Sequence, residues 1–132
     1  MRQIFLLVKL YLDSIILYVQ NVERLKDFYT TVLGLQLVED DPPLWVVLRA
    51  GNSYIALHKI GDPYFNQLKD GDKFHNNTKI VFKIEEDINE LRQQLIASNV
   101  PMRELKTFDN YGYWLCDGED PEGNVFQLKQ AK

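Results

Sequence analysis

The chain has few of the residues that form cross-links, span membranes or hold nucleic acid. Its 132 residues include a single cysteine, Cys116, so no internal disulfide can form and no Cys-x-x-Cys pair is present to bind zinc. The formal net charge of −4 supplies no basic field for nucleic acid. Lys9 interrupts the apolar N-terminus far short of the roughly 20 residues that span a bilayer, and no signal-peptide cleavage site follows. These absences predict a cytoplasmic protein whose partners include neither nucleic acid nor a membrane.

Two simple expectations follow for the cysteine and for the N-terminus. Cys116 is expected to be a small buried hydrophobic residue. Residues 1–11 are expected to form an additional strand or a tethered arm.

The sequence contains one pattern of predicted elements that occurs twice. A β-rich run, "DSIILYV" at 13–19, precedes an amphipathic helix at 21–34 that Gly34 ends. Turn residues separate the three β-rich runs that follow, at 35–39, 44–50 and 53–59. After a polar segment the same order returns, with a strand at 78–84, a helix at 87–99 capped by Asp87 and ended by Asn99, and strands at 102–108, 111–117 and 124–130.

The spacing between matching residues indicates a duplicated module. The first strands match at an offset of 65 positions, from Ser14 to Lys79, and the last strands at 71, from Ala56 to Gln127. We therefore predict an α+β fold of two tandem βαβββ modules, with curved mixed sheets around a shared cleft and helices on the outer faces. The chain is interpreted as one domain, 1–132, with module one at 12–60, a linker at 61–77 and module two at 78–130.

Alternation along each strand assigns its residues to two faces. Large apolar residues should meet the helices, namely Ile15, Leu17, Val19, Ile55, Leu57, Ile80, Phe82, Ile84, Phe126 and Leu128. The residues between them are mixed in character and should face the cleft, namely Ser14, Ile16, Tyr18, Tyr54, Ala56, His58, Lys79, Val81, Lys83, Val125, Gln127 and Lys129. Matching "VVLRAG" with "YWLCDG" places Trp45, Arg49 and Trp114 on the side that we assign to the cleft.

Two motifs resemble a known family, the vicinal oxygen chelate superfamily. The segment "LDSIILYVQNVERLKDFYTTVLGL" resembles its opening strand and helix, and "DPEGNVFQL" is similar to its closing turn and strand. This superfamily includes glyoxalase I, extradiol dioxygenases, and bleomycin- and fosfomycin-resistance proteins. The resemblance covers residues 12–130 and implies the paired-module fold, but a fold does not by itself determine an activity.

The resemblance also implies where a metal ion would be held. In the metal-dependent members each module supplies one ligand from its first strand and one from its last, mostly His and Glu and sometimes Gln. The corresponding positions here are Ser14, Ala56, Lys79 and Gln127. Alanine has no donor atom, a lysine ammonium must lose its proton before it binds a cation, and serine and glutamine are weak neutral ligands. We therefore expect that the usual metal site is absent and that no cofactor is bound.

His58 is the one complication, because it lies two residues after Ala56 on the same face of the strand. It could act as a displaced metal ligand. A single histidine without a neighbouring carboxylate does not make a metal site, so a hydrogen-bonded histidine at the cleft is the simpler interpretation. His75 lies in the polar linker and is expected to be a solvated loop residue.

The predicted cleft suits a planar or aromatic molecule that carries an anionic or carbonyl oxygen. Aromatic walls supply contact area, and Arg49 is the best single partner for an anion because of its forked donors. The same aromatic residues are equally consistent with a core or a dimer interface. The candidate ligand-binding residues are Ser14, Tyr18, Trp45, Arg49, Tyr54, Ala56, His58, Lys79, Trp114 and Gln127.

Two functions of different classes remain open. In the first, the protein is a metal-free module that binds a small organic molecule, as the bleomycin-resistance proteins do. In the second, it is an enzyme, either a glyoxalase-like lyase or dioxygenase with a relocated metal site that includes His58, or a metal-free catalyst that uses Lys79 or His58 as acid or base. The lack of a paired carboxylate among the predicted cleft residues favours the first. The resemblance also implies a homodimer.

Overall fold

The computed structural model describes residues 12–73 and 78–132, and these residues form seven strands in two sheets. His75 and the segment 1–11, for which expectations were stated above, lie outside the described residues. The elements are, in order, β1 (Ser14–Val19), α1 (Val22–Asp27), η1 (Phe28–Val32), β2 (Gln36–Asp41), β3 (Trp45–Ala50), β4 (Ser53–Lys59), α2 (Asp62–Phe65), β5 (Lys79–Ile84), α3 (Ile88–Ala97), β6 (Tyr113–Glu119) and β7 (Val125–Ala131).

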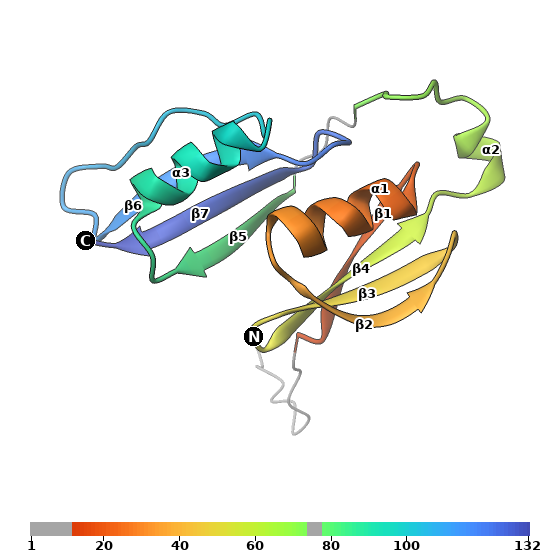
Figure 1. Cartoon of the computed structure of the whole chain (residues 1–132), viewed down its shortest axis with the longest axis horizontal. Coiled ribbons are helices and arrows are strands. Elements are labelled where there is room, and N and C mark those ends of the chain that lie inside the picture. The colour runs from red at the N-terminus through yellow and green to blue at the C-terminus, as the bar shows by residue number, and fades with distance from the viewer. Residues whose placement is uncertain (1–11, 74–77) are drawn as a thin grey trace, which may run out of the picture.

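The two sheets repeat one topology. The first has the strand order β1-β4-β3-β2 and the second has the order β5-β7-β6. In each, the strand that opens the module is an edge strand that runs parallel to the strand that closes it, while the remaining pairs are antiparallel. Figure 1 shows the sheets side by side, with α1 in front of the first and α3 in front of the second. The predicted α+β fold of two tandem modules with mixed sheets is confirmed.

The helices begin and end at the residues that the sequence indicated. The side chains of Asn21 and Asp87 each accept a hydrogen bond from the backbone N–H three residues later, which caps α1 and α3. α1 continues directly into η1, a π-helical turn, and Gly34 ends this segment with a φ of +76°. Asn99 ends the second helical segment with a φ of +64°. Within the described ranges, no helix has the length and apolar character needed to cross a membrane.

The strand predicted at 102–108 is wrong. This segment meets β6 only at two isolated bridges, formed by Met102 and Lys106. After the second bridge, the hydroxyl of Thr107 donates to the carbonyl of Tyr113 at 2.7 Å. A side chain thus takes an acceptor that a backbone N–H would use in a regular ladder, so pairing stops there. The second sheet has three strands among the described residues, where four were predicted.

The residues predicted to meet the helices lie in the core, together with helix residues such as Leu25 and Leu95. Seven of them are at most 8% exposed, namely Leu17, Val19, Ile55, Leu57, Ile80, Phe126 and Leu128. The other three pack against the same core and are partly buried, namely Ile15, Phe82 and Ile84. Cys116 is fully buried, as predicted.

The turn at residues 120–124, here called the closing turn, joins the two modules through buried polar groups. Asp120 Oδ2 accepts a hydrogen bond from the hydroxyl of Tyr29 at 2.6 Å. The carboxylate of Glu122 accepts from the backbone N–H groups of Gln20 and Asn21, at 2.7 and 2.8 Å. Burial raises the pKa of both acids, although the hydrogen bonds oppose this shift. The closing turn therefore fixes the position of module one against module two.

Candidate ligand-binding site

The face of the first sheet that carries no helix, here called its open face, holds an aromatic cluster. Tyr18 and Trp45 flank His58 on the two neighbouring strands, with ring centroids 5.3 and 5.7 Å from the imidazole centroid. Further along the same face, Arg49 donates a 3.2 Å hydrogen bond to the hydroxyl of Tyr54. Tyr18 is 58% exposed, so the cluster is open to solvent. Five predicted site residues therefore lie on one accessible face.

His58 has the surroundings of a hydrogen-bonded histidine. Its Nδ1 lies 2.7 Å from the carbonyl oxygen of Lys59, which fixes the ring by its own strand. No group of three or more His, Cys, Asp or Glu side chains gathers around a common point in the part of the chain that the structure describes. Among the described residues, His58 therefore belongs to no cluster of three or more side chains of the types that bind metal ions.

The open face of the second sheet is polar and centres on Asp117. Gln127 donates to Asp117 Oδ1 at 2.9 Å, and the Lys79 ammonium donates to Oδ2 at 2.7 Å. Two further cations, Arg103 and Lys106, approach the same Oδ2 at 3.5 and 4.0 Å. Burial of Asp117 raises its pKa, but the hydrogen bonds from Lys79 and Gln127 outweigh that effect and hold the pKa below its ordinary value. Sequence reasoning missed Asp117, the carboxylate on this face.

The sequence pattern assigned Trp114 to the cleft side of its strand, and this assignment is wrong. The same register error placed Asp117 on the helix side, so Asp117 was not recognised as a site residue. The sequence comparison matched Gly51 with Gly118, but Gly51 lies in a turn, whereas Gly118 lies inside β6. The register of β6 moves by three residues as a result, so that Asp117, not Trp114, is the counterpart of Val47 and pairs with Gln127 on the open face. Trp114 lies on the opposite face, the side of the buried Cys116. The closing turn was the signal that could have placed β6 correctly, because it is the true counterpart of the turn at Gly51.

The four positions that carry metal ligands in metal-dependent relatives do not fit a metal ion here. Ser14 and Ala56 lie on the open face of the first sheet, and Lys79 and Gln127 on that of the second. Ala56 has no donor atom, and the ammonium of Lys79 is held by Asp117. The amide nitrogen of Gln127 also donates to Asp117, so this side chain is engaged as a donor. These residues provide hydrogen bonds and charge rather than a ligand set.

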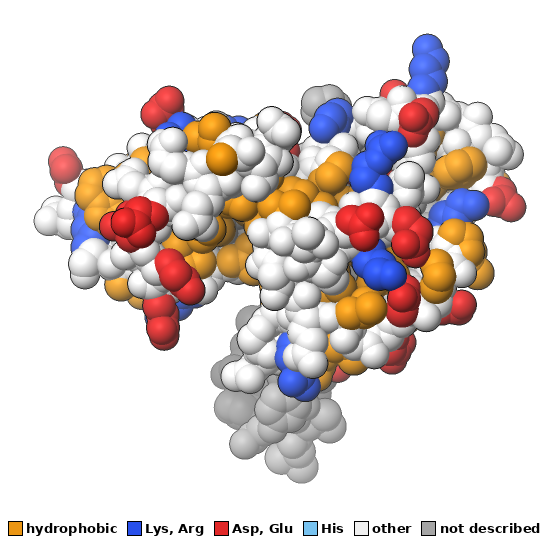
Figure 2. All heavy atoms as spheres, viewed as in Figure 1, with side chains coloured by type: hydrophobic (Ala, Val, Ile, Leu, Met, Phe, Trp, Pro, Cys, Tyr) orange, Lys and Arg blue, Asp and Glu red, His pale blue; other side chains and the backbone are white. Residues whose placement is uncertain are grey.

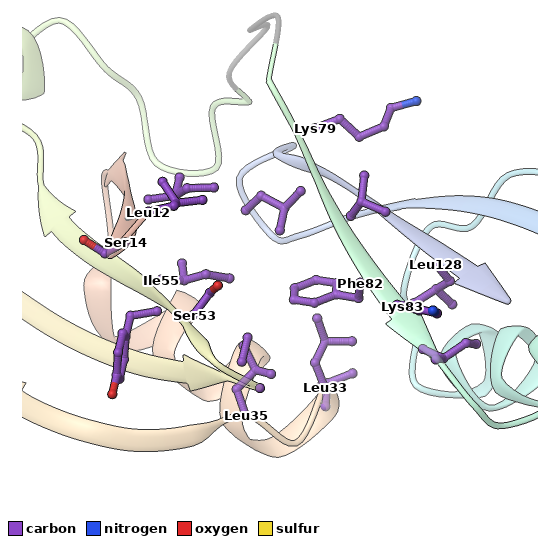
Figure 3. A pocket seen from close by; sticks show the side chains of 18 of the residues that line it. Leu12, Ser14, Leu33, Leu35, Ser53, Ile55, Lys79, Phe82, Lys83 and Leu128 are labelled. Atoms are coloured by element: carbon purple, nitrogen blue, oxygen red, sulfur yellow. The ribbon is translucent and has the colours of Figure 1, made fainter. Parts of the chain in front are cut away.

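A groove of about 580 Å³ runs between β1 and β5, the edge strands of the two modules. Most of its lining is apolar and comes from both modules. In Figure 3, Ile55 and Phe82 point toward one another from opposite sides, whereas the ammonium of Lys79 is directed away from the groove. Figure 2 shows hydrophobic side chains exposed where the two halves of the molecule meet. Three predicted site residues line the groove, namely Ser14, Tyr54 and Lys79.

Comparison with known protein families agrees with this architecture. The family model described as the Glyoxalase/Bleomycin resistance protein/Dioxygenase superfamily matches residues 11–128. The chain belongs to this superfamily. The resemblance inferred from the opening and closing motifs is thereby confirmed. No curated protein sequence matches the chain.

Solved structures of similar fold include both enzymes and binding proteins. A lactoylglutathione lyase from Agrobacterium tumefaciens is 18% identical with a TM-score of 0.71, and the match covers 91% of this chain and 92% of that one. The antibiotic-binding protein TnmS3 from Streptomyces sp. CB03234 is 18% identical with a TM-score of 0.72, over 97% and 100% of the two chains. The fosfomycin resistance protein FosX from Listeria monocytogenes is 13% identical with a TM-score of 0.69, over 96% of each chain. At these identities the likeness shows the superfamily fold alone, so the function must be argued from the side chains.

Proposed function

We propose that this superfamily member is a metal-free protein that binds a small organic molecule, planar in shape and carrying an anionic or carbonyl group. The observation that carries the proposal is the apolar groove, which residues of both modules line. Its volume of about 580 Å³ falls within the range of roughly 300–1,000 Å³ that is typical of small-molecule pockets. The aromatic cluster lies on the open face of the first sheet, and Tyr54 on the same face also lines the groove.

We propose that the protein functions without a metal ion or any other cofactor. This part of the proposal rests on the side chains at the four positions that hold metal ligands in metal-dependent relatives. Ala56 and Lys79 stand at two of the four ligand positions, where one has no lone pair and the other is paired with Asp117 as an ammonium. The ammonium of Lys79 would repel a metal cation at these positions, and the carboxylate of Asp117 is already paired with that ammonium. The binding role therefore agrees with the side chains present.

The enzyme alternative has less support from the geometry. Lys79 is paired with Asp117 as a charged donor, so it is not a proton acceptor in this arrangement. His58 keeps Nε2 as a proton acceptor, because only its Nδ1 faces a backbone carbonyl, but His58 does not line the groove. A lyase or dioxygenase of this superfamily requires a metal ion, and a metal-free catalyst requires a group able to accept a proton. Stoichiometric bound metal in the purified protein would favour the enzyme.

The proposal includes a homodimer, a cytoplasmic location and a single domain of two modules, 12–60 and 78–130. A large apolar side chain on an edge strand supports the dimer, since Ile16 on β1 is 43% exposed and does not line the groove. Sedimentation equilibrium checks the dimer, with an expected mass of twice the 15.5 kDa of one chain. A mass of 15.5 kDa at micromolar concentration contradicts it.

Binding is tested by thermal shift with a panel of planar aromatic carboxylates and their neutral analogues. The groove is blocked with Val81→Trp, because Val81 lines the groove and is half exposed, so a larger side chain does not enter the core. Val38→Trp on β2 is the matched control, since Val38 is 47% exposed and does not line the groove. We expect panel members to raise the Tm of the wild type and of Val38→Trp, but not of Val81→Trp. Equal shifts in the two variants would place the ligand outside the groove.

A further inference from the structure

We infer that the open face of the second sheet holds a subsite for an oxyanion, formed by Lys79, Arg103 and Lys106 around Asp117. The inference rests on the proposed function for the rest of the ligand, and it specifies the chemistry of the charged end. The group it fits best is a dianion of the phosphate or phosphonate class.

The side chains around Asp117 carry more positive charge than is required to neutralise its carboxylate. One buried carboxylate is neutralised by one paired cation, and Lys79 fulfils this role at 2.7 Å. Gln127 satisfies the other oxygen, Oδ1, at 2.9 Å. Arg103 and Lys106 nevertheless converge on Oδ2 at the longer distances of 3.5 and 4.0 Å. Two positive charges therefore remain beyond the balance of this cluster.

The three cations face solvent while the carboxylate between them does not. The side chains of Lys79, Arg103 and Lys106 are 39%, 58% and 46% exposed, and that of Asp117 is 4% exposed. An ammonium has three donors and a guanidinium has five. Among the described residues only Asp117 accepts from these side chains, so most of their donors are open to an incoming oxyanion.

The surrounding face strengthens the positive field. Lys83 and Lys129 pair with one another across β5 and β7 on this open face. Five cations thus stand against two carboxylates, Asp117 and Glu119, on a face of a chain whose net charge is −4. Such a local concentration of one sign attracts anions even when the whole molecule is acidic. A surplus of two charges at the centre is balanced by a dianion and only half balanced by a monocarboxylate.

Lys79 connects this subsite with the groove. Its side chain lines the groove, yet its ammonium is directed away from the groove in Figure 3 and toward Asp117. A ligand whose planar part lies in the groove can therefore place a charged group beyond Lys79, at the cationic cluster.

The test compares three probes that share a phenyl ring, namely phenyl phosphate, benzoate and neutral benzyl alcohol, by isothermal titration of the full chain. The variants are Arg103→Gln and Lys106→Gln. Arg24→Gln is the matched control, because Arg24 also makes one long ion pair, 3.6 Å to Asp70, and its side chain is 43% exposed.

We expect the wild type to bind phenyl phosphate more tightly than benzoate and benzoate more tightly than benzyl alcohol. Each of the two cluster variants should weaken phenyl phosphate about tenfold, the effect of losing one charge-assisted hydrogen bond, and leave benzyl alcohol unchanged. Arg24→Gln should change neither. If Arg103→Gln and Lys106→Gln bind phenyl phosphate as well as the wild type does, or weaken benzyl alcohol equally, the subsite is wrong while ligand binding stands.

Inorganic phosphate alone tests the subsite without the groove. In the wild type, phosphate should shift the backbone amide NMR signals of Lys79, Arg103 and Asp117, and these shifts should disappear in Arg103→Gln. If phosphate produces these shifts in the wild type but none of the three phenyl probes binds, the subsite is supported and the proposed ligand is contradicted. Their absence in the wild type overturns the subsite.

Discussion

The hydroxyl of Tyr29 donates a 2.6 Å hydrogen bond to Oδ2 of Asp120, 91 positions later in the chain, and both residues are at most 1% exposed. Beside this bond, the rings of Phe28 and Phe126 lie 6.0 Å apart and add an apolar contact between the modules. The closing turn that ends the superfamily motif is thus the joint between the two halves. The width of the groove depends on this joint, because the groove lies between the same two modules.

Removing the Tyr29 hydroxyl should destabilise the fold. Tyr29→Phe leaves Asp120 Oδ2 buried with one donor fewer, which should lower the free energy of unfolding by about 1–3 kcal/mol. Tyr64→Phe is the control, because Tyr64 is 65% exposed and should change stability by less than about 0.5 kcal/mol. Urea unfolding measures both. Equal stability of the two variants would mean that the joint contributes nothing.

The buried acids of the closing turn predict how stability changes with pH. The pKa of Glu122 is raised by burial above 4.5 in the folded protein, so the folded state binds a proton at a pH where the unfolded state does not. Stability should therefore rise as the pH falls from 7 through this raised value toward 4.5, and Asp120 acts in the same direction. The pKa of Asp117 is lowered in the folded protein, so Asp117 stabilises the fold at neutral pH. This contribution is lost only as the pH falls below the ordinary pKa of 3.8.

Urea unfolding of the wild type and of Glu122→Gln between pH 7 and pH 4.5 checks this expectation. The wild type should gain more stability on acidification than the variant does, because glutamine does not titrate. The same slope in both proteins would contradict the raised pKa of Glu122.

Gly118 marks a close approach of the connection after α3 to the second sheet. A methyl group at this position would lie 2.5 Å from Met102 Sδ and 2.6 Å from Phe126 Cζ. Gly118→Ala should therefore cost about 1–3 kcal/mol of stability, as overpacking does in other cores. Gly112→Ala, where no atom lies within 4 Å, should cost much less. Thermal unfolding of the pair gives the comparison, and equal Tm values would contradict the packing at Met102.

The two tryptophans report separately on the two faces. Trp45 lies on the open face of the first sheet and Trp114 on the helix side of the second, and the chain has no other tryptophan. A ligand that extends from the groove over the open face of the first sheet should therefore change the fluorescence of Trp114→Phe, which retains Trp45, and leave that of Trp45→Phe unchanged. The reverse result would place the ligand on the helix side.

The fold could be predicted because its signals are local or repeated. The cap at Asp87, the helix ends at Gly34 and Asn99, and the offset between the modules each follow from residue types and spacing. The connection at 102–108 was predicted wrongly, because its apolar residues, Met102, Leu105 and Phe108, recur at every third position and lack the alternation of a strand. Thr107 also replaces a ladder bond with a side-chain bond. Such competition depends on where the hydroxyl meets a carbonyl in space.

The sequence predicted which side chains share a face of the first sheet, and it did so only in part for the second sheet. Tyr18, Trp45 and His58 lie together because strand alternation alone places them. Asp117 and Trp114 exchanged faces, since a register shift of an odd number of residues, here three, reverses every side chain of a strand. A shared cleft was predicted, but the lining of the groove was not, and residues expected to meet the helices, such as Ile55 and Phe82, line it. The groove lies between two edge strands whose separation is set by the closing turn rather than by any pattern along the strands.

Metal-free binding is tested most directly by measuring metal content and ligand affinity on one sample. Purified protein is analysed for iron, nickel, zinc and manganese, and phenyl phosphate and the tightest binder of the aromatic carboxylate panel are titrated before and after dialysis against EDTA. Because the four ligand positions hold Ser14, Ala56, Lys79 and Gln127, we expect substoichiometric metal and the same Kd in both titrations. One equivalent of bound metal whose removal abolishes binding would contradict the proposed function.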